Sequence, residues 1–418
     1  MDVLSLIFLV GSILVGIVLK VNIGLVSIGA SLVLGTMAGM GAGAIRGGFP
    51  TTLFVTLLGV MVLFGIASEN KTLELLCQRI VYLAGNRVYL IPIIVFFFSA
   101  ALAAVGPGTV PVMSLMAVFA CSLAAEMKVS PLLLAATVVL GAAGGGLTPV
   151  APTGIIGLTL AAEAGFTGFE VAYAVNMMIA MTVYFVVIYF ALGGYKMKSA
   201  IDLTAVELPK FNRNQVITMI AILVLVVLVI FFGYDVGLTA FTMAMFLLFL
   251  RVANEKNVLA SVSWSTLVLI SGVQVLMSMT FSLGGIDLLA SGLATIMTPV
   301  TAPGVMGLTA GIMSWFASTS GVVMPTLIPT IPAIIEQVGG GLTYTAMISA
   351  ITNTASAAGM SPFSTGGALG LAAYSQIAKP TEEEHSRLFI RLFAVSFCGV
   401  VVIALLAFTG IYNILAPI

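Results

Sequence analysis

Charged residues are scarce in this chain of 418 residues, at 7% of the total, whereas 61% of the residues are hydrophobic. A soluble domain could not bury so much apolar surface, but a lipid bilayer accommodates it. The formal net charge is zero, so the chain offers no basic surface for nucleic acid. These shortages predict an all-α, polytopic membrane protein.

Cysteine and histidine are also rare. Cys77, Cys121 and Cys398 are too scattered to form a disulfide framework or a metal-ligand set, and small packing residues are the simplest interpretation. The single histidine, His385, is predicted to lie in a polar loop over residues 381–386. No intramembrane pair of nucleophile and base is visible, so we expect no enzyme and no cofactor.

Eight uninterrupted apolar runs have lengths that suit a hydrocarbon core of about 30 Å at 1.5 Å per helical residue. They are Val3–Leu19, Ile23–Met40, Thr52–Ala67, Val171–Leu192, Val216–Phe232, Val236–Leu250, Ser265–Leu283 and Leu388–Ile411. No positively charged segment precedes the first run, which favours a retained span over a cleaved signal peptide.

Four other apolar segments are interrupted by clusters of glycine, proline and hydroxyl residues. They cover residues 88–125, 131–162, 304–335 and 344–374. Proline and glycine end helices, and non-helical backbone at membrane depth is tolerated only inside protein or beside a cavity. We therefore predict a re-entrant hairpin at 88–125 and at 304–335, each followed by a broken helix.

Short stretches of the sequence recur at an offset of 213 positions. Glu74-Leu75-Leu76 returns as Asp287-Leu288-Leu289, and Gly146-Leu147-Thr148-Pro149 returns as Gly359-Met360-Ser361-Pro362. We expect two repeats, 1–192 and 216–418, joined by a linker at 193–215. Five crossings in each repeat, an odd number, would invert the second repeat relative to the first.

Each repeat divides further in the same order. The scaffold spans are 3–67 and 216–283, the interfacial helices are 69–87 and 284–297, and the final spans are 171–192 and 388–411. If the linker is cytoplasmic, every Lys and Arg except Arg46 falls on the cytoplasmic side. The positive-inside rule then predicts that both chain termini face outward from the inner membrane.

The interrupted segments hold the candidate site, because no charged residue is predicted at membrane depth. Free N–H groups at helix starts suit an anion, and freed carbonyl groups at helix ends suit sodium. The predicted substrate-binding residues are Gly106, Pro107, Gly108, Thr109, Thr153, Ser318, Thr319, Ser320, Ser364 and Thr365. The predicted sodium-binding residues are Gly106, Thr109, Gly146, Thr148, Ser318, Asn353, Gly359 and Ser361.

Each of these assignments has an alternative. The Ser and Thr hydroxyls could serve only as helix caps, and Asn353 could serve only as a hydrogen bond between helices. Capping and ligand binding can also hold together at one residue.

Two stretches resemble a known group of carriers. Residues 128–133 and 141–154, the latter reading GAAGGGLTPVAPTG, resemble the N-terminal signature of the malonate carrier (MatC-like) dicarboxylate family, and residues 360–369 resemble its C-terminal motif. That family belongs to the ion transporter superfamily, with the divalent anion–sodium symporters. The symporters carry Ser-Asn-Thr at both hairpin tips, whereas this chain has Gly-Pro-Gly-Thr at 106–109 and Ser-Thr-Ser-Gly at 318–321.

The resemblance implies a homodimeric elevator carrier, in which the first three spans of each repeat form a static frame. We expect a secondary transporter that imports a small dicarboxylate of the C3–C4 class with sodium. Two alternatives remain open: the membrane subunit of a binding-protein-dependent (TRAP-type) carrier, and a passive anion channel.

Overall fold

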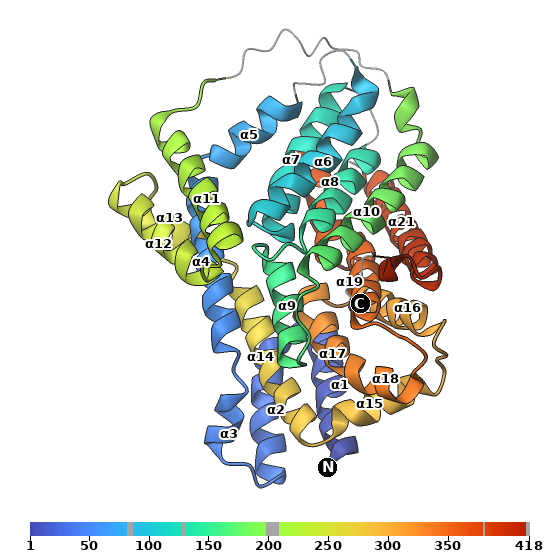
Figure 1. Cartoon of the computed structure of the whole chain (residues 1–418). Coiled ribbons are helices and arrows are strands. Elements are labelled where there is room, and N and C mark those ends of the chain that lie inside the picture. Colours follow the sequence, from blue (N-terminus) through green and yellow to red (C-terminus); the bar gives the residue numbers. More distant parts are fainter. Residues whose placement is uncertain (82–86, 128–130, 198–208, 379–380, 415–418) are drawn as a thin grey trace.

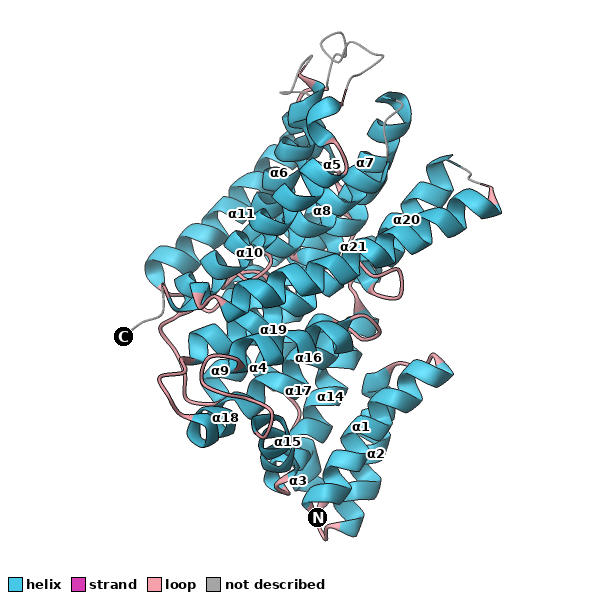
Figure 2. Ribbon diagram, turned by 90° about the vertical axis from the view of Figure 1, so that its right-hand side faces the viewer, coloured by secondary structure: helices cyan, strands magenta, loops and turns pink. Residues whose placement is uncertain are grey.

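The computed structural model describes residues 1–81, 87–127, 131–197, 209–378 and 381–414. These residues form helices joined by turns, and none of them is in a strand (Figure 2). Seven helical segments in this part of the chain are long and apolar enough to cross a bilayer. They are Asp2–Leu19, Thr51–Glu69, Val88–Val105, Glu170–Ala191, Trp264–Ser282, Thr319–Val338 and Glu382–Phe408. The all-helical, multi-pass membrane class predicted from composition is confirmed.

Six helices form one group, called here the six-helix group. They are α1 (Asp2–Leu19), α2 (Ile23–Met37), α4 (Thr51–Glu69), α11 (Arg213–Phe232), α12 (Val236–Phe249) and α14 (Trp264–Ser282). Within it α2 packs on α14 and α4 packs on α12. Figure 1 shows α1, α2 and α14 at the lower end of the molecule and α11 and α12 on its left side.

Glycine allows both of these helix pairs to approach closely. A Cβ atom added to Gly272 would lie 2.1 Å from the carbonyl oxygen of Gly24, and one added to Gly59 would lie 2.5 Å from that of Gly237. Small residues at a crossing let two helix backbones come into contact in a membrane. Gly237 follows Gly24 by 213 positions, and Gly272 follows Gly59 by the same number.

Four short helices flank the six-helix group. They are α3 (Ala42–Gly47), α5 (Thr72–Val81), α13 (Glu255–Ser261) and α15 (Gly285–Ala294). The second and fourth fall in the segments 69–87 and 284–297, of which 82–86 lie outside the described residues. No helix was predicted at the positions of α3 and α13, because neither segment has a sustained apolar pattern.

The interrupted segments are helices separated by short breaks. The first half contains η2 (Val88–Leu90), α6 (Ile91–Val105), α7 (Thr109–Met127), α8 (Pro131–Gly145), α9 (Pro152–Glu163) and α10 (Glu170–Ala191), followed by η3 (Gly194–Lys196). The second half contains α16 (Ala302–Ser314), η5 (Thr319–Val323), α17 (Met324–Leu327), η6 (Ile328–Thr330), α18 (Ile331–Val338), α19 (Tyr344–Ala358), α20 (Thr365–Ala378), α21 (Glu382–Phe408) and η7 (Ile411–Asn413).

The second arm of the segment 304–335 is less regular than the first. It begins with a π-helical turn, η5, and then passes through α17, η6 and α18. Pro325, Pro329 and Pro332 stand near the starts of these three pieces. Each proline lacks the N–H that an α-helix needs and crowds the preceding turn, so the arm changes its helical geometry at each one.

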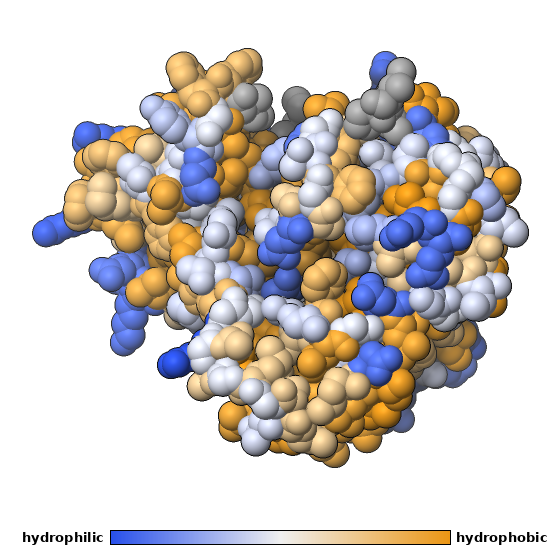
Figure 3. Space-filling model, turned by 60° about the horizontal axis from the view of Figure 1, so that its bottom comes forward, coloured by the Kyte–Doolittle hydropathy of each residue, from blue (hydrophilic) through white to orange (hydrophobic). Residues whose placement is uncertain are grey.

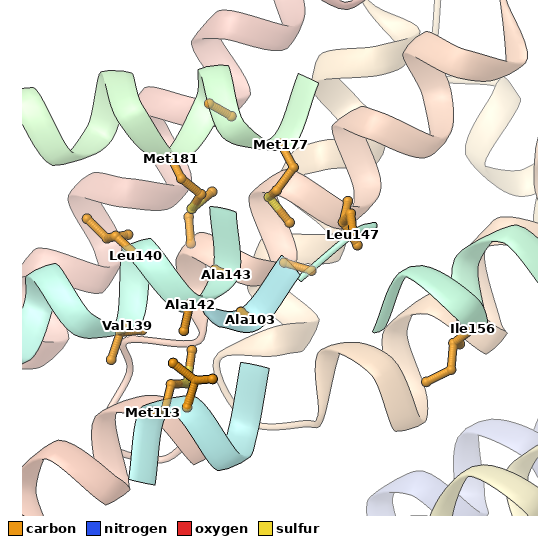
Figure 4. Packing of buried hydrophobic residues seen from close by; sticks show 14 of the residues in the cluster. Ala103, Met113, Val139, Leu140, Ala142, Ala143, Leu147, Ile156, Met177 and Met181 are labelled. Atoms are coloured by element: carbon orange, nitrogen blue, oxygen red, sulfur yellow. The ribbon is translucent and has the colours of Figure 1, made fainter. Parts of the chain in front are cut away.

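α8 lies in the middle of the largest hydrophobic core and packs against α6, α7 and α10. Figure 4 shows Met177 and Met181 of α10 on one side of α8 and Met113 of α7 on the other. α19 packs in a similar setting against α16, α21 and α10. Both helices are therefore surrounded by protein, which is the condition for a polar break at membrane depth.

One local prediction is wrong. Residues 381–386 were predicted to form a loop, but α21 begins at Glu382 and includes His385. The Thr381 hydroxyl accepts a hydrogen bond from the Glu384 amide (3.3 Å), and the Glu384 carboxylate accepts one from the Thr381 amide (2.8 Å). This capping box starts the helix six residues before Leu388, where the predicted apolar span begins.

Candidate functional site

The break between α6 and α7 depends on two glycines. Gly106 has φ 142° and Gly108 has φ 79°, in a region that side chains other than glycine rarely adopt. An added Cβ would lie 2.3 Å from the Phe64 ring at the first position and 2.6 Å from Pro152 at the second. The tip of this segment therefore lies against both α4 and the start of α9.

The break between α8 and α9 is closed by backbone hydrogen bonds. The Gly154 amide donates to the Gly146 carbonyl, with an N···O distance of 2.9 Å. Two further bonds join the Gly146 amide to Ala143 (3.0 Å) and the Ala151 amide to Thr148 (3.1 Å). A Cβ atom at Gly154 would lie 2.1 Å from the Thr148 oxygen, so this turn requires glycine there.

The break between α19 and α20 has the same three bonds. The Gly367 amide donates to Gly359 (3.0 Å), the Gly359 amide to Ser356 (3.1 Å), and the Ser364 amide to Ser361 (2.8 Å). Each donor and acceptor follows its counterpart in the first break by 213 positions. The two breaks therefore share one local geometry.

Residues from the helix breaks and from both tips line one central cavity of about 60 Å³. Eight predicted site residues are among them: Thr109, Thr153, Ser318, Thr319, Ser320, Gly359, Ser364 and Thr365. They come from α7, α9, η5 and α20 and from residues directly next to η5, α19 and α20, all of them distant in the sequence. The prediction that the interrupted segments meet at one place agrees with this arrangement.

Hydroxyl groups dominate the wall of the central cavity. The Thr109 and Thr153 hydroxyl oxygens lie 3.4 Å apart and connect the first tip to α9. The Thr319 hydroxyl donates to the Ala355 carbonyl (3.1 Å), while the Ser318 hydroxyl accepts from the Gly321 amide (3.1 Å). Ser318 thus caps a helix, as the alternative interpretation of these hydroxyls allowed.

The electrostatics of the central cavity come from helix ends. None of the described residues that line it is charged. However, α7 begins at Thr109, η5 at Thr319 and α20 at Thr365, and Thr153 is the second residue of α9. Four helix N-termini therefore meet at this cavity, each with the positive end of a helix dipole. Such an arrangement favours an anion. In the first turn of α9, however, Pro152 has no N–H and the Gly154 amide is already bonded to Gly146.

Several predicted site residues lie outside the cavity wall. The Thr148 hydroxyl donates to the Ala104 carbonyl near the end of α6 (2.7 Å), and the Ser361 hydroxyl donates to the Trp315 carbonyl after α16 (3.1 Å). Asn353 donates to the Asn176 carbonyl (3.2 Å), so its alternative role as an interhelical hydrogen bond is realised. Gly106, Gly108 and Gly146 shape the turns, and Pro107 lines a neighbouring cavity.

Five lining residues were not predicted. They are Val110, Met113, Ala143, Ser356 and Gly366. The 213-residue repeat could have indicated some of them. Gly366 is the counterpart of Thr153, which was predicted, and Ala143 and Ser356 are counterparts of each other. Val110 and Met113 carry no such signal, because an apolar side chain in an apolar helix does not stand out.

Two larger cavities lie beside the six-helix group. One, of about 580 Å³, lies among α3, α14, α15 and α18 and includes Gln274, whose side chain donates to Glu163 of α9 (3.2 Å). Its elements are those at the lower end of the molecule, and Figure 3 shows hydrophilic residues gathered among apolar ones on that face. The other, of about 340 Å³, lies among α4, α7 and the start of α14. Val110 lines both this cavity and the central one.

The walls of the two larger cavities correspond at the same offset. Met61, Phe64, Gly65 and Ser68 line the smaller one, and Gln274, Met277, Ser278 and Phe281 line the larger one. Each residue of the second set follows its counterpart by 213 positions.

Comparison with known proteins agrees with this architecture. Residues 1–146 match the family described as dicarboxylate carrier protein MatC N-terminus, so the resemblance proposed from the sequence is confirmed for that part of the chain. Among solved structures, the fold is similar to that of the YdaH transporter of Alcanivorax borkumensis, with a TM-score of 0.58 and 15% identity over 90% of this chain and 88% of that one. Comparison with curated protein sequences finds no match. The two similarities support a transporter and not an enzyme.

Proposed function

We propose that this chain, whose first 146 residues match a dicarboxylate carrier family, is a secondary transporter that takes up a small dicarboxylate of the C3–C4 class together with sodium. The meeting of four helix N-termini at one uncharged cavity carries this proposal. A dianion at that point would gain free N–H donors and favourable dipoles without an arginine clamp. Malonate is the first compound to test.

Sodium would complete the charge balance. A dianion in a low-dielectric site is costly unless opposite charge accompanies it. No Lys, Arg or His side chain is among the described residues that line the central cavity. A sodium ion held by hydroxyl and carbonyl oxygens of the tips and breaks would supply the missing charge. Thr148 and Ser361 are suited to this role, because a donating hydroxyl keeps its lone pairs.

The size of the central cavity indicates that binding requires movement. Pockets that enclose small-molecule ligands usually have about 300–1,000 Å³, so a cavity of about 60 Å³ is small for a dicarboxylate with its ion. We propose that the tips and breaks move together as an elevator against the six-helix group. The two larger cavities that border this group support such a movement.

We also propose that the two halves are inverted repeats and that the protein works as a homodimer in the inner membrane, with both termini outside. The matched backbone hydrogen bonds of the two breaks support the repeat. So do the helix starts, since α3 begins at Ala42 and α13 at Glu255, 213 positions later.

Uptake of labelled C3–C4 dicarboxylates into proteoliposomes of the purified chain tests the proposal. Accumulation against a gradient, abolished when the sodium gradient is collapsed, is the expected result. Transport that needs a soluble receptor protein would favour the TRAP-type alternative, and passive equilibration would favour a channel. Uptake driven equally by a pH gradient without sodium would overturn sodium coupling.

A further inference from the structure

The first turns of α7 separate two cavities. Thr109 and Met113 line the central cavity. Pro111 and Ser114 line the cavity of about 340 Å³, called here the α4–α7 cavity. Val110 lines both, and it is the one lining position that the two cavities share among the described residues. A solute that moves from one of these cavities to the other would therefore pass the Val110 side chain.

The exposure of α7 agrees with this division. Val110 and Ser114 are four residues apart and share one face of the helix, and both side chains are exposed. Val112 and Met113 are only 1% and 5% exposed, whereas Val110 is 39% exposed. Val110 thus stands at the edge of the open face of α7, next to the buried face that borders the central cavity.

The central cavity has no comparable connection to the cavity of about 580 Å³, called here the α14–α15 cavity. These two cavities share none of the described residues that line them. Thr153 of α9 lines the central cavity and Leu160 of α9 lines the α14–α15 cavity, and seven helical residues span about 10 Å. Three residues further on, Glu163 accepts the hydrogen bond from Gln274 of α14 (3.2 Å), which joins this end of α9 to the six-helix group.

The α4–α7 and α14–α15 cavities lie near opposite ends of α4. Phe49 and Pro50, directly before this helix, line the α14–α15 cavity, and Ser68 in its last turn lines the α4–α7 cavity. The 19 residues of α4 are long enough for one crossing of a bilayer. Figure 1 shows α3 below α4 and α5 above it. In this conformation the central cavity therefore adjoins the cavity at the α5 end of α4 and is separated from the cavity at the α3 end.

The charges of these two cavities differ in the same sense. None of the described residues that line the α4–α7 cavity is charged, and four of them are serines. The α14–α15 cavity is lined by Glu163, Asp287 and Glu336, with no Lys, Arg or His among its described lining residues. Carboxylates that line a cleft disfavour a second anion there. The α4–α7 cavity is thus the better path for an anion.

We propose that Val110 forms the constriction through which the solute passes between the α4–α7 cavity and the central cavity, and that the width left by its side chain selects the solute. Valine is β-branched and keeps one χ1 rotamer in a helix, so this width is well defined. The identity of the solute as a dicarboxylate rests on the proposed function, but the path past Val110 does not.

The test follows a thiol placed in the central cavity of the purified full-length protein. Ser356→Cys introduces it with little change of shape, and peptide mass spectrometry distinguishes its modification from that of the native cysteines. The reagent is sulfonatoethyl methanethiosulfonate, a small anion. We expect Val110→Trp, added to Ser356→Cys, to slow the modification at least about tenfold. Ala333→Trp is the matched control, because it adds the same ring at the α14–α15 cavity and should leave the rate unchanged.

An unchanged rate in Val110→Trp, or an equal slowing in Ala333→Trp, would overturn the proposed path. Val110→Phe takes the place of Val110→Trp should gel filtration show that the latter is not folded. Absence of modification in Ser356→Cys alone would also overturn it.

Uptake into proteoliposomes tests the selection by width. Val110→Ala should raise the uptake of dimethylmalonate relative to that of malonate, and an unchanged ratio would contradict the selection. The thiol reaction requires no transport, so the two proposals can fail separately. The expected thiol rates without any dicarboxylate uptake would contradict the proposed function alone, and dicarboxylate uptake with no effect of Val110→Trp on the thiol would contradict the path alone.

Discussion

The Gly154 amide donates a hydrogen bond to the Gly146 carbonyl across the first helix break, at 2.9 Å. The bond holds the start of α9 over the end of α8, so that one helix ends and another begins at the same level in the protein. Gly367 and Gly359 make the same bond at 3.0 Å. The proposed function depends on this arrangement, because it places helix N-termini at the central cavity.

Replacing Gly154 or Gly367 with alanine should therefore impair transport. The new Cβ would lie 2.1 Å from the Thr148 oxygen in the first case and 2.3 Å from the Met360 oxygen in the second, so the turn must open. We expect the maximal uptake rate to fall at least about tenfold, which corresponds to about 1.4 kcal/mol. Proteoliposome uptake measures the rate.

Gly29→Ala provides the control for these two variants. Gly29 lies within α2 and an added Cβ would meet no atom within 4 Å, so transport should be unchanged. Uptake by Gly154→Ala and Gly367→Ala at the rate of the control would contradict the requirement for a tight turn.

Removal of hydroxyl groups from the central cavity should weaken substrate binding. Thr109→Val and Thr153→Val keep the shape of the side chain but remove a group that can donate to a carboxylate. Hydrogen bonds to charged groups contribute about 1.5–3 kcal/mol, so the apparent KM should rise at least about tenfold. Concentration-dependent uptake gives the KM.

Thr→Ser at the same two positions should restore most of the affinity, since it restores the hydroxyl. Thr242→Val, which changes an exposed hydroxyl bonded to its own helix, should have no effect. An unchanged KM in both cavity variants would show that the substrate binds elsewhere.

Pro149 and Pro362 occupy equivalent positions in the two breaks, 213 residues apart. Alanine in place of either supplies a backbone N–H and relieves the restriction on the preceding residue, which favours continuation of α8 or α19. We expect transport to decline more than expression does. Uptake normalised to the amount of purified protein separates the two effects, and normal uptake by both variants would argue against a site at the breaks.

Thr381→Ala should lower the thermal stability of the protein without altering the KM. The substitution removes half of the capping box that begins α21, and losing an N-cap costs about 1 kcal/mol. A thermal unfolding assay in detergent measures the change. Thr381→Ser should restore the melting temperature, and a KM change in Thr381→Ala would imply a role beyond capping.

Much of the fold could be predicted because interruptions in apolar helices are visible as residue types. Gly106 and Gly108 have backbone angles that only glycine readily adopts. Pro149 and Pro362 lack the N–H that continues a helix. These residue types were therefore enough to predict the positions of the helix breaks. The hydroxyl residues next to them were then predicted as a group, and eight of the predicted site residues line the central cavity.

Other features depend on contacts that local sequence does not reveal. Val110 belongs to the site only because the first tip lies against η5 and α20, and nothing in an apolar helix marks that position. Thr148 and Ser361 appear equivalent to the lining hydroxyls in sequence, but their side chains turn toward the ends of neighbouring helices. α3 and α13 are too short for helical periodicity to be recognised.

The glycine crossings in the six-helix group have a mechanical consequence. Where Gly24 meets Gly272 and Gly59 meets Gly237, there is no room for even one methyl group between the helices. Two such contacts prevent α2 and α4 from sliding lengthwise past their partners, because any shift would bring a larger side chain into the contact. We therefore expect the proposed movement of the tips and breaks to occur at the outer faces of these helix pairs, and not between them.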